Sequence, residues 1–189
     1  MHNCIKLYLK TTNPSQLRKK KLEKLMEARF RANLHFWARL PEDAEEVPVH
    51  INHLRCRDAN INDDILSKLV TVIHSVDMFD LDDNEITNEG INYLTKLESI
   101  KELRLKECRN IDNGCLKYLN QITSLELLHL GSTGVTIDGL YQLKNLVNLK
   151  TLLVSADEEK EIIREKLSAI ANDLPYCEFI VNHKVMDLY

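Results

Sequence analysis

The stretch IKELRLKECRNI, residues 100–111, decides the fold. Its apolar residues follow the spacing I-x-x-L-x-L-x-x-C-x-x-I. Leu103 and Leu105 alternate with charged residues, which predicts a short strand with one buried face. Cys108 follows where the chain would leave that strand, and a small polar side chain there can bond backbone groups of the turn. The stretch therefore predicts one strand followed by a tight turn.

The same spacing recurs along most of the chain, every 24 or 25 residues. The first strand position is occupied by Leu54, Phe79, Leu103, Leu128 and Leu152, and the second by Cys56, Leu81, Leu105, Leu130 and Val154. The turn position carries Ala59, Asn84, Cys108, Thr133 and Asp157. Apolar pairs at helical spacing follow each turn, such as Leu116 and Leu119. A period of this length indicates stacked units, because one unit alone cannot bury its apolar edge.

These residues resemble the pattern L-x-x-L-x-L-x-x-N/C-x-L, and the chain is identified as a suspected leucine-rich-repeat protein over about residues 47–181. The resemblance implies an α/β fold: a right-handed solenoid with a parallel sheet on its concave side and helices on its convex side. A mainly helical N-terminal cap is expected before it.

Three segments are expected. Residues 1–46 form the cap, 47–157 the repeats, and 158–189 a closing repeat with a tail. In the cap, residues 5–9 alternate as a strand does, a helix is expected after Asn13, and the aromatic residues of 30–40 are expected to cover the first repeat. In the closing repeat, a helix over 162–174 ends at Pro175 and a last strand spans 177–181.

Composition narrows the class of protein. The 189 residues carry a formal net charge of −4, which gives no reason to expect nucleic acid. No signal peptide, presequence or membrane span is expected. The cysteines are odd in number, five, and widely spaced, which favours reduced thiols. We expect a cytoplasmic monomer.

Residues of the strands that point away from the core form ladders of adjacent side chains. We predict a partner-binding site on this concave face, comprising Arg55, Asp80, Asp82, Arg104, Lys106, Leu127, His129 and Leu153. Two alternatives remain open. The charges can simply neutralise one another across strands, and the basic stretch from Arg18 to Lys24 can bind an acidic partner or an anionic surface.

Catalytic and metal-binding motifs are not recognised in the sequence. A phosphate loop, a nucleophile elbow and a zinc-protease helix are all missing from it. His53 and Cys56 are expected on opposite faces of one strand, so they do not converge on a metal ion. We therefore expect no cofactor, no metal and no enzymatic activity.

The family resemblance implies a protein-interaction module that acts as an adaptor or scaffold toward another protein. One alternative is an inhibitor or immunity-type regulator of an enzyme. A third is a small assembly or coupling factor of a larger complex, because residues 108–116 are similar to a stretch of the mitochondrial ATP synthase coupling factor B family (subunit s).

Overall fold

The computed structural model describes residues 14–41 and 43–188. Contacts between residues divide the chain into two compact units, residues 1–43 and 44–189. The described part of the first unit is dominated by one long helix, and the second unit holds the sheet with its helices.

The N-terminal helix is α2, Pro14–Ala38. A helix after Asn13 is what the sequence predicts, and proline is well suited to a first helical turn. Leu22, Leu25 and Met26 are exposed on this helix. The strand expected over residues 5–9 lies outside the described residues, and the covering role of the segment 30–40 stays a prediction.

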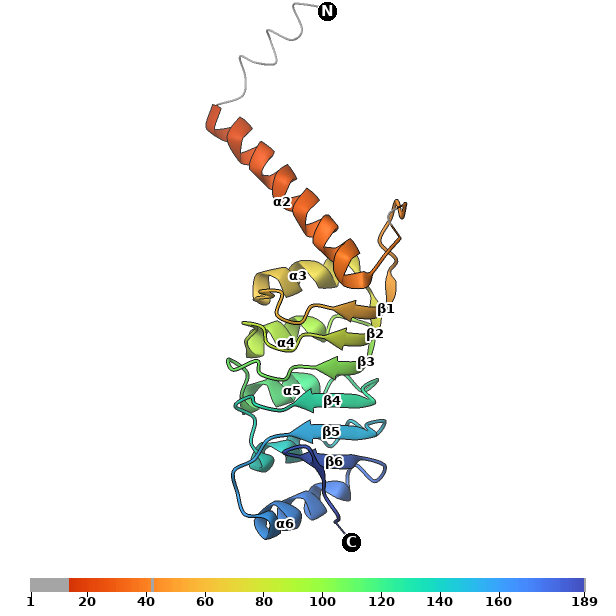
Figure 1. The fold of residues 1–189 in the computed structure, drawn as a ribbon, viewed down its shortest axis with the longest axis vertical. Coiled ribbons are helices and arrows are strands. Elements are labelled where there is room, and N and C mark those ends of the chain that lie inside the picture. The colour runs from red at the N-terminus through yellow and green to blue at the C-terminus, as the bar shows by residue number, and fades with distance from the viewer. Residues whose placement is uncertain (1–13, 42, 189) are drawn as a thin grey trace, which may run out of the picture. The chain divides into compact units, whose positions relative to one another are not determined.

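The second unit contains a seven-stranded sheet whose strands lie in chain order (Figure 1). The strands are β1 (His50–Arg55), β2 (Ser75–Asp80), β3 (Ser99–Arg104), β4 (Leu127–Leu130), β5 (Thr151–Val154), β6 (Glu178–Val181) and β7 (Lys184–Val185). The first six pair in parallel, and β7 pairs antiparallel with β6. The register joins Leu54 to Phe79, Phe79 to Leu103 and Leu103 to Leu128, as the period predicts.

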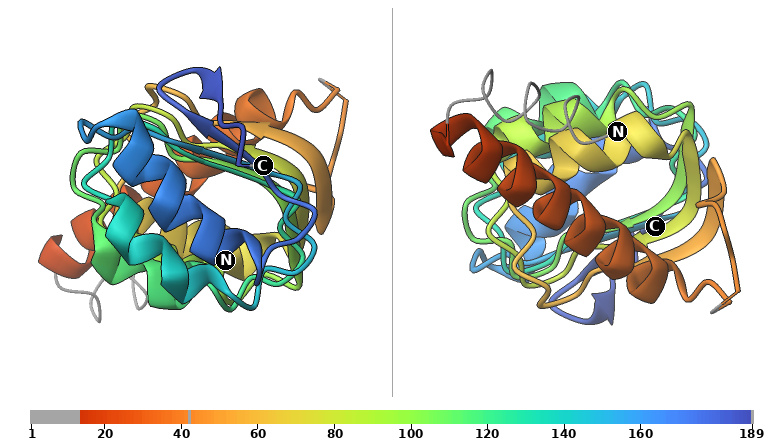
Figure 2. Two further views of the ribbon diagram at one scale, coloured as in Figure 1. Left: turned by 90° about the horizontal axis from the view of Figure 1, so that it is seen from below. Right: turned by 90° about the horizontal axis from the view of Figure 1, so that it is seen from above.

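A helical segment connects each of the first five strands to the next. These segments are α3 (Asp63–Val72), α4 (Asn88–Leu94), η1 (Asn113–Cys115) with α5 (Leu116–Leu119), η2 (Ile137–Leu143) and α6 (Lys160–Ala171). Viewed along the stack, the helices lie on one side and the strands on the other (Figure 2). The segment at Leu140 and Leu143 is a 3₁₀-helix, and the predicted C-terminal helix and last strand are present. The structure is thus an α/β fold with a mostly parallel sheet, consistent with a small leucine-rich-repeat protein.

The core is built from the repeated apolar positions. The residues of both strand columns from Leu54 to Val154 are buried, Cys56 included. Burying each leucine contributes about 1.5–3 kcal/mol relative to leaving it exposed. Phe179 and Val181 continue the two columns into β6. Stacking of identical positions therefore provides one continuous apolar interior.

The turn position after β2, β3 and β4 acts as the sequence predicts. The Asn84 side chain is buried, accepts a hydrogen bond from the Ile61 amide at 2.8 Å, and donates to the Cys56 carbonyl at 2.8 Å. Cys108 Sγ donates to the Leu81 carbonyl at 3.2 Å, and Thr133 donates to the Leu130 carbonyl at 2.8 Å. These contacts satisfy backbone groups that no strand or helix partner reaches.

One residue before this position, the backbone is left-handed in four successive units. The φ angles are 49° at Asp58, 55° at Asp83, 63° at Glu107 and 57° at Ser132. A residue with a Cβ atom adopts this region at a cost of about 1–2 kcal/mol. Recurrence of the same strained turn shows that the units share one backbone path, which fixes where the next side chains point.

Candidate functional site

The face of the sheet opposite the helices is called here the outer face. Cross-strand pairing aligns Arg55, Asp80, Arg104, His129 and Leu153 in a single ladder. All five side chains are exposed or half-buried, whereas the residues that alternate with them are buried. The predicted ladder is therefore present on the outer face, and it continues to Ile180 of β6, which pairs with Val185 of β7. Whether it binds a partner stays a prediction.

A hydrogen-bonded cluster occupies the first half of the outer face. Arg57 Nη2 donates to Asp82 Oδ2 at 2.6 Å, and Arg57 Nε donates to Asp80 Oδ2 at 3.4 Å. The second oxygen of Asp82 accepts the Lys106 amide at 2.8 Å. Asp82 is only 3% exposed, and this burial raises the pKa of its carboxyl. The cluster thus fixes the side chains of Asp80, Asp82 and Arg57 at the C-terminal ends of β1, β2 and β3.

Arg104 lies beside this cluster without joining it. Its Nε is the one buried side-chain nitrogen or oxygen, among residues 14–41 and 43–188, that lacks a hydrogen-bond partner. Lys106 pairs instead with Glu107, with 2.9 Å between Nζ and Oε1. Arg104 is therefore a cation held on the outer face without a bonded anion.

His129 lies next to Arg104 in the ladder. Burial lowers the pKa of its imidazole, and Arg104, Lys106, His183 and Arg57 add to this effect, so that the pKa is about 4. The imidazole is consequently neutral at pH 7 and available as a hydrogen-bonding group that adds no charge.

The C-terminal third of the outer face is more apolar. Leu127, Leu153 and Ile180 are half-buried there on three successive strands. The outer face thus changes from charged at β1–β3 to apolar at β5 and β6. Ile180 was missed in the sequence because the last unit is longer than 25 residues. The alternation of Phe179 and Val181 around it was the available signal.

A second charged band was also missed. On the outer face, near the start of the strands, Lys101 Nζ lies 2.7 Å from Asp77 Oδ1, and Lys150 Nζ lies 2.5 Å from Glu126 Oε2. His50 Nε2 lies 3.4 Å from the other oxygen of Asp77. Simple alternation does not predict this band, because two residues in a row face outward between the buried Val76 and Phe79. The available signal in the sequence was the pair of residues between the two apolar positions of the L-x-x-L spacing, since both residues of this pair face outward.

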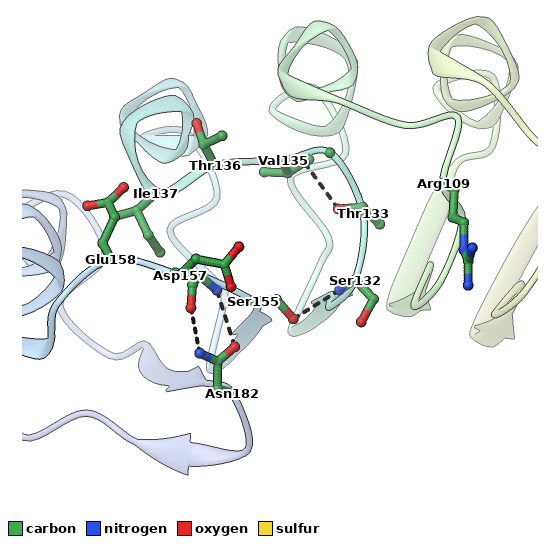
Figure 3. Close-up of a pocket in the computed structure, with 12 residues that line it drawn as sticks. Arg109, Ser132, Thr133, Val135, Thr136, Ile137, Ser155, Asp157, Glu158 and Asn182 are labelled. Carbon is green, nitrogen blue, oxygen red and sulfur yellow. Dashed lines mark hydrogen bonds between the residues drawn. The ribbon is translucent and has the colours of Figure 1, made fainter.

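A cavity of about 830 Å³ lies beyond the ends of the strands, between the turns of the fourth and fifth units (Figure 3). Asn182 closes one side by donating to the Ala156 carbonyl at 2.6 Å and accepting from its amide at 3.2 Å. Arg109 lies well apart from Asp157 and Glu158 (Figure 3). Glu158 is engaged by Lys166 at 2.7 Å. These side chains do not converge on one point, so the cavity does not offer an acid–base pair.

The described residues contain no group of three or more His, Cys, Asp or Glu that could hold a metal ion. None of their helices is long and apolar enough to cross a membrane. Burial raises the pKa of the Cys108 thiol to about 11 and that of Cys115 to about 12, which keeps both thiols protonated.

No protein-family model matches the chain. Among characterised proteins, it is 31% identical over 87 residues to human mitochondrial ATP synthase subunit s, covering 43% of this chain and 44% of that protein. It is 29% identical over 119 residues to the bovine subunit s, covering 59% of this chain and 58% of that protein. The chain spans about half the length of the relatives it matches.

These relatives are mitochondrial, which contradicts the cytoplasmic location expected from the sequence. That expectation rested on the composition of the first residues of the given sequence, whereas the similarity to bovine subunit s covers 59% of the chain. The chain is thus distantly similar to mitochondrial ATP synthase subunit s (coupling factor B), a family of leucine-rich-repeat proteins.

Proposed function

We propose that this chain is a non-catalytic subunit or assembly factor of a mitochondrial ATP synthase. The observation that carries the proposal is the similarity to subunit s of human and bovine ATP synthase. It favours the assembly-factor alternative over a stand-alone adaptor and over an enzyme inhibitor.

The repeats form a right-handed solenoid in this proposal, with the outer face on its concave side. The N-terminal cap extends to residue 46, the repeats to 157 and the closing unit to 189, and the protein acts as a monomer. The partner-binding surface comprises Arg55, Asp80, Asp82, Arg104, Lys106, Leu127, His129 and Leu153. The strand register supports the proposal for Arg55, Asp80, Arg104, His129 and Leu153, which are successive cross-strand neighbours.

A binding role suits the chemistry of this surface better than catalysis does. Asp82 has both carboxylate oxygens engaged, by Arg57 and by the Lys106 amide, so it is poorly placed to accept a substrate proton. His129 remains neutral because of burial and surrounding cations. Fixed charges beside an apolar patch are typical of a protein-recognition surface.

The test is association with the enzyme complex. An epitope-tagged chain is expressed in cells of its own source, mitochondria are isolated, and native electrophoresis follows the tag and ATP synthase together. We expect the tag in the mitochondrial fraction and in the ATP synthase band. Exclusion from mitochondria, or migration separate from every ATP synthase species and assembly intermediate, would overturn the proposal.

The binding surface is tested by a charge reversal with a matched control. Arg104→Glu should reduce recovery of the chain with ATP synthase about tenfold or more, since about 1.4 kcal/mol of lost affinity is sufficient. Lys144→Glu reverses an exposed charge directly after η2 and should leave recovery unchanged. Equal recovery of the two variants would place the contact elsewhere on the chain.

A further inference from the structure

The environment of Arg104 indicates what kind of group the outer face receives. The carboxylates nearest to this arginine already serve other donors. Asp82 accepts from Arg57 and from the Lys106 amide, and Asp80 accepts from Arg57. The Arg104 side chain itself makes no hydrogen bond or ion pair with any described residue, and its Nε is buried. Leaving a buried donor unbonded costs about 1–3 kcal/mol, and a partner's acceptor recovers this cost at Nε only when the half-buried side chain shifts to expose that atom.

The electrostatic surroundings favour an anion. Arg57, Arg104 and Lys106 all lie close enough to His129 to disfavour its protonation. A group that is repelled by one more positive charge lies in a positive potential, which attracts a negative charge. The neutral imidazole leaves that potential undiminished and provides a hydrogen-bonding nitrogen beside Arg104.

Gly131 determines where the imidazole of His129 can lie. It comes two residues after His129, and a Cβ atom there would lie 3.0 Å from His129 Nε2, which is tighter than ordinary contact. Glycine therefore allows the imidazole to occupy this space on the outer face.

Apolar side chains border the same point. Leu153 of β5 pairs with His129 of β4, and Ile180 of β6 pairs with Leu153. Leu127 lies on β4, two residues before His129. All three are half-buried rather than buried, so each presents part of its surface to a partner. A ligand that places its charge at Arg104 would meet apolar surface on the side of β5 and β6.

We infer that this part of the outer face binds a carboxylate group of a partner protein that is flanked by apolar side chains. Arg104 contacts the carboxylate, His129 contributes a hydrogen bond, and Leu153 and Ile180 pack against the apolar neighbours. The inference deepens the proposed function by naming the chemistry of the partner's contact. Guanidinium and carboxylate groups pair strongly because both are planar and carry opposite charges.

The experiment uses the full-length protein by itself, labelled with ¹⁵N, and two capped tripeptides. One is leucine–glutamate–leucine, and the other has glutamine in place of glutamate and so differs by a single charge. We expect the glutamate peptide to shift saturably the amide signals of residues 104–106, 129–131 and 153–155. The glutamine peptide should bind at least about tenfold more weakly, which corresponds to about 1.4 kcal/mol. Equal responses to the two peptides would overturn the inference.

Two further arms separate the contributions. Arg104→Gln should abolish the preference for glutamate, whereas Lys144→Gln, at an exposed residue directly after η2, should retain it. Each variant's own spectrum reports whether it is folded. A serine–glutamate–serine peptide should bind more weakly than the leucine peptide. If inorganic phosphate or the serine peptide produces the same shifts at the same concentration, the surface is a general anion site and the inference is wrong.

The result is independent of the test of ATP synthase association. Preference for the glutamate peptide with no co-migration would leave the contact chemistry standing and reject ATP synthase as the partner. Co-migration without a preference for the glutamate peptide would leave ATP synthase standing as the partner and reject the proposed contact with a carboxylate.

Discussion

His129 shows how one position on the outer face depends on residues far away in the chain. Its neighbours Arg104, Lys106 and His183 come from two other strand ends, and together with burial they hold the pKa of the imidazole at about 4. The sequence placed His129 in the ladder, because only the 24/25-residue period was needed for that. Its neutral state could not be predicted, because both burial and the distance to each cation are properties of the packed sheet.

The lowered pKa predicts a pH dependence of stability. In the unfolded chain His129 titrates near 6.5, so between about pH 6.5 and 4 the unfolded state binds the extra proton and the folded state does not. The free energy of unfolding should therefore fall as the pH is lowered from 7 through this window. Urea denaturation at pH 7 and pH 5 measures the fall, and His129→Gln should make it smaller. An identical pH dependence in the variant would contradict the pKa of about 4.

At the scale of elements, polar side chains link the start of each helix to the next unit. Asp63 of α3 accepts hydrogen bonds from the Thr87 amide at 2.9 Å and the Thr87 hydroxyl at 2.6 Å. Thr87 in turn is the N-cap of α4. Gly90 allows this approach, since a Cβ atom there would lie 2.3 Å from Asp63 Oδ1. A helix start is thereby attached to its neighbour, in addition to the apolar contacts.

The neighbouring acid offers a matched control for this link. Asp63 and Asp64 both lie in the first turn of α3 and interact similarly with the helix dipole, but Asp64 is exposed. Asp63→Ala should lower the free energy of unfolding by about 1.5–3 kcal/mol, the usual range for hydrogen bonds to a charged group. Asp64→Ala should lower it by less than about 1 kcal/mol. Urea denaturation of both variants decides the point, and equal losses would show that the link contributes nothing.

The helical segments themselves differ from unit to unit in a way that the period does not predict. α3 has ten residues, α4 seven and α5 four, and η2 is a 3₁₀-helix of seven residues. Their apolar residues keep the same spacing, because each must reach the same interior. Whether a segment forms an α-helix or a 3₁₀-helix depends on how closely it packs on the next segment, which is about 24 residues away in the sequence.

At the scale of the whole molecule, the stacked core should make the repeat unit unfold cooperatively. Leu105 is fully buried directly after β3, and its amide donates to the His129 carbonyl of β4 at 2.9 Å. Leu105→Asp places an uncompensated charge in the stack, at a cost of about 3–5 kcal/mol or more. That is a large fraction of the stability of an ordinary domain.

Circular dichroism during heating tests this expectation. Leu105→Asp should greatly lower the melting temperature or abolish the cooperative transition. Val147→Asp introduces the same charge at a 56% exposed apolar residue and should change the free energy of unfolding by no more than about 0.5 kcal/mol. Unchanged melting of Leu105→Asp would be incompatible with the strand register described above.

The sequence by itself determined the repeat and, through it, the buried columns, the order and register of the strands, and the ladder from Arg55 to Leu153. It could do so because a strand exposes alternate residues and a fixed period aligns equal positions. Only the tertiary structure decided which charges meet. It showed the band at Asp77 and Lys101, the continuation of the ladder to Ile180, and the unbonded Arg104 beside a neutral His129. Pairing and ionisation depend on distance and burial, which residues on different strands acquire only when the units are stacked.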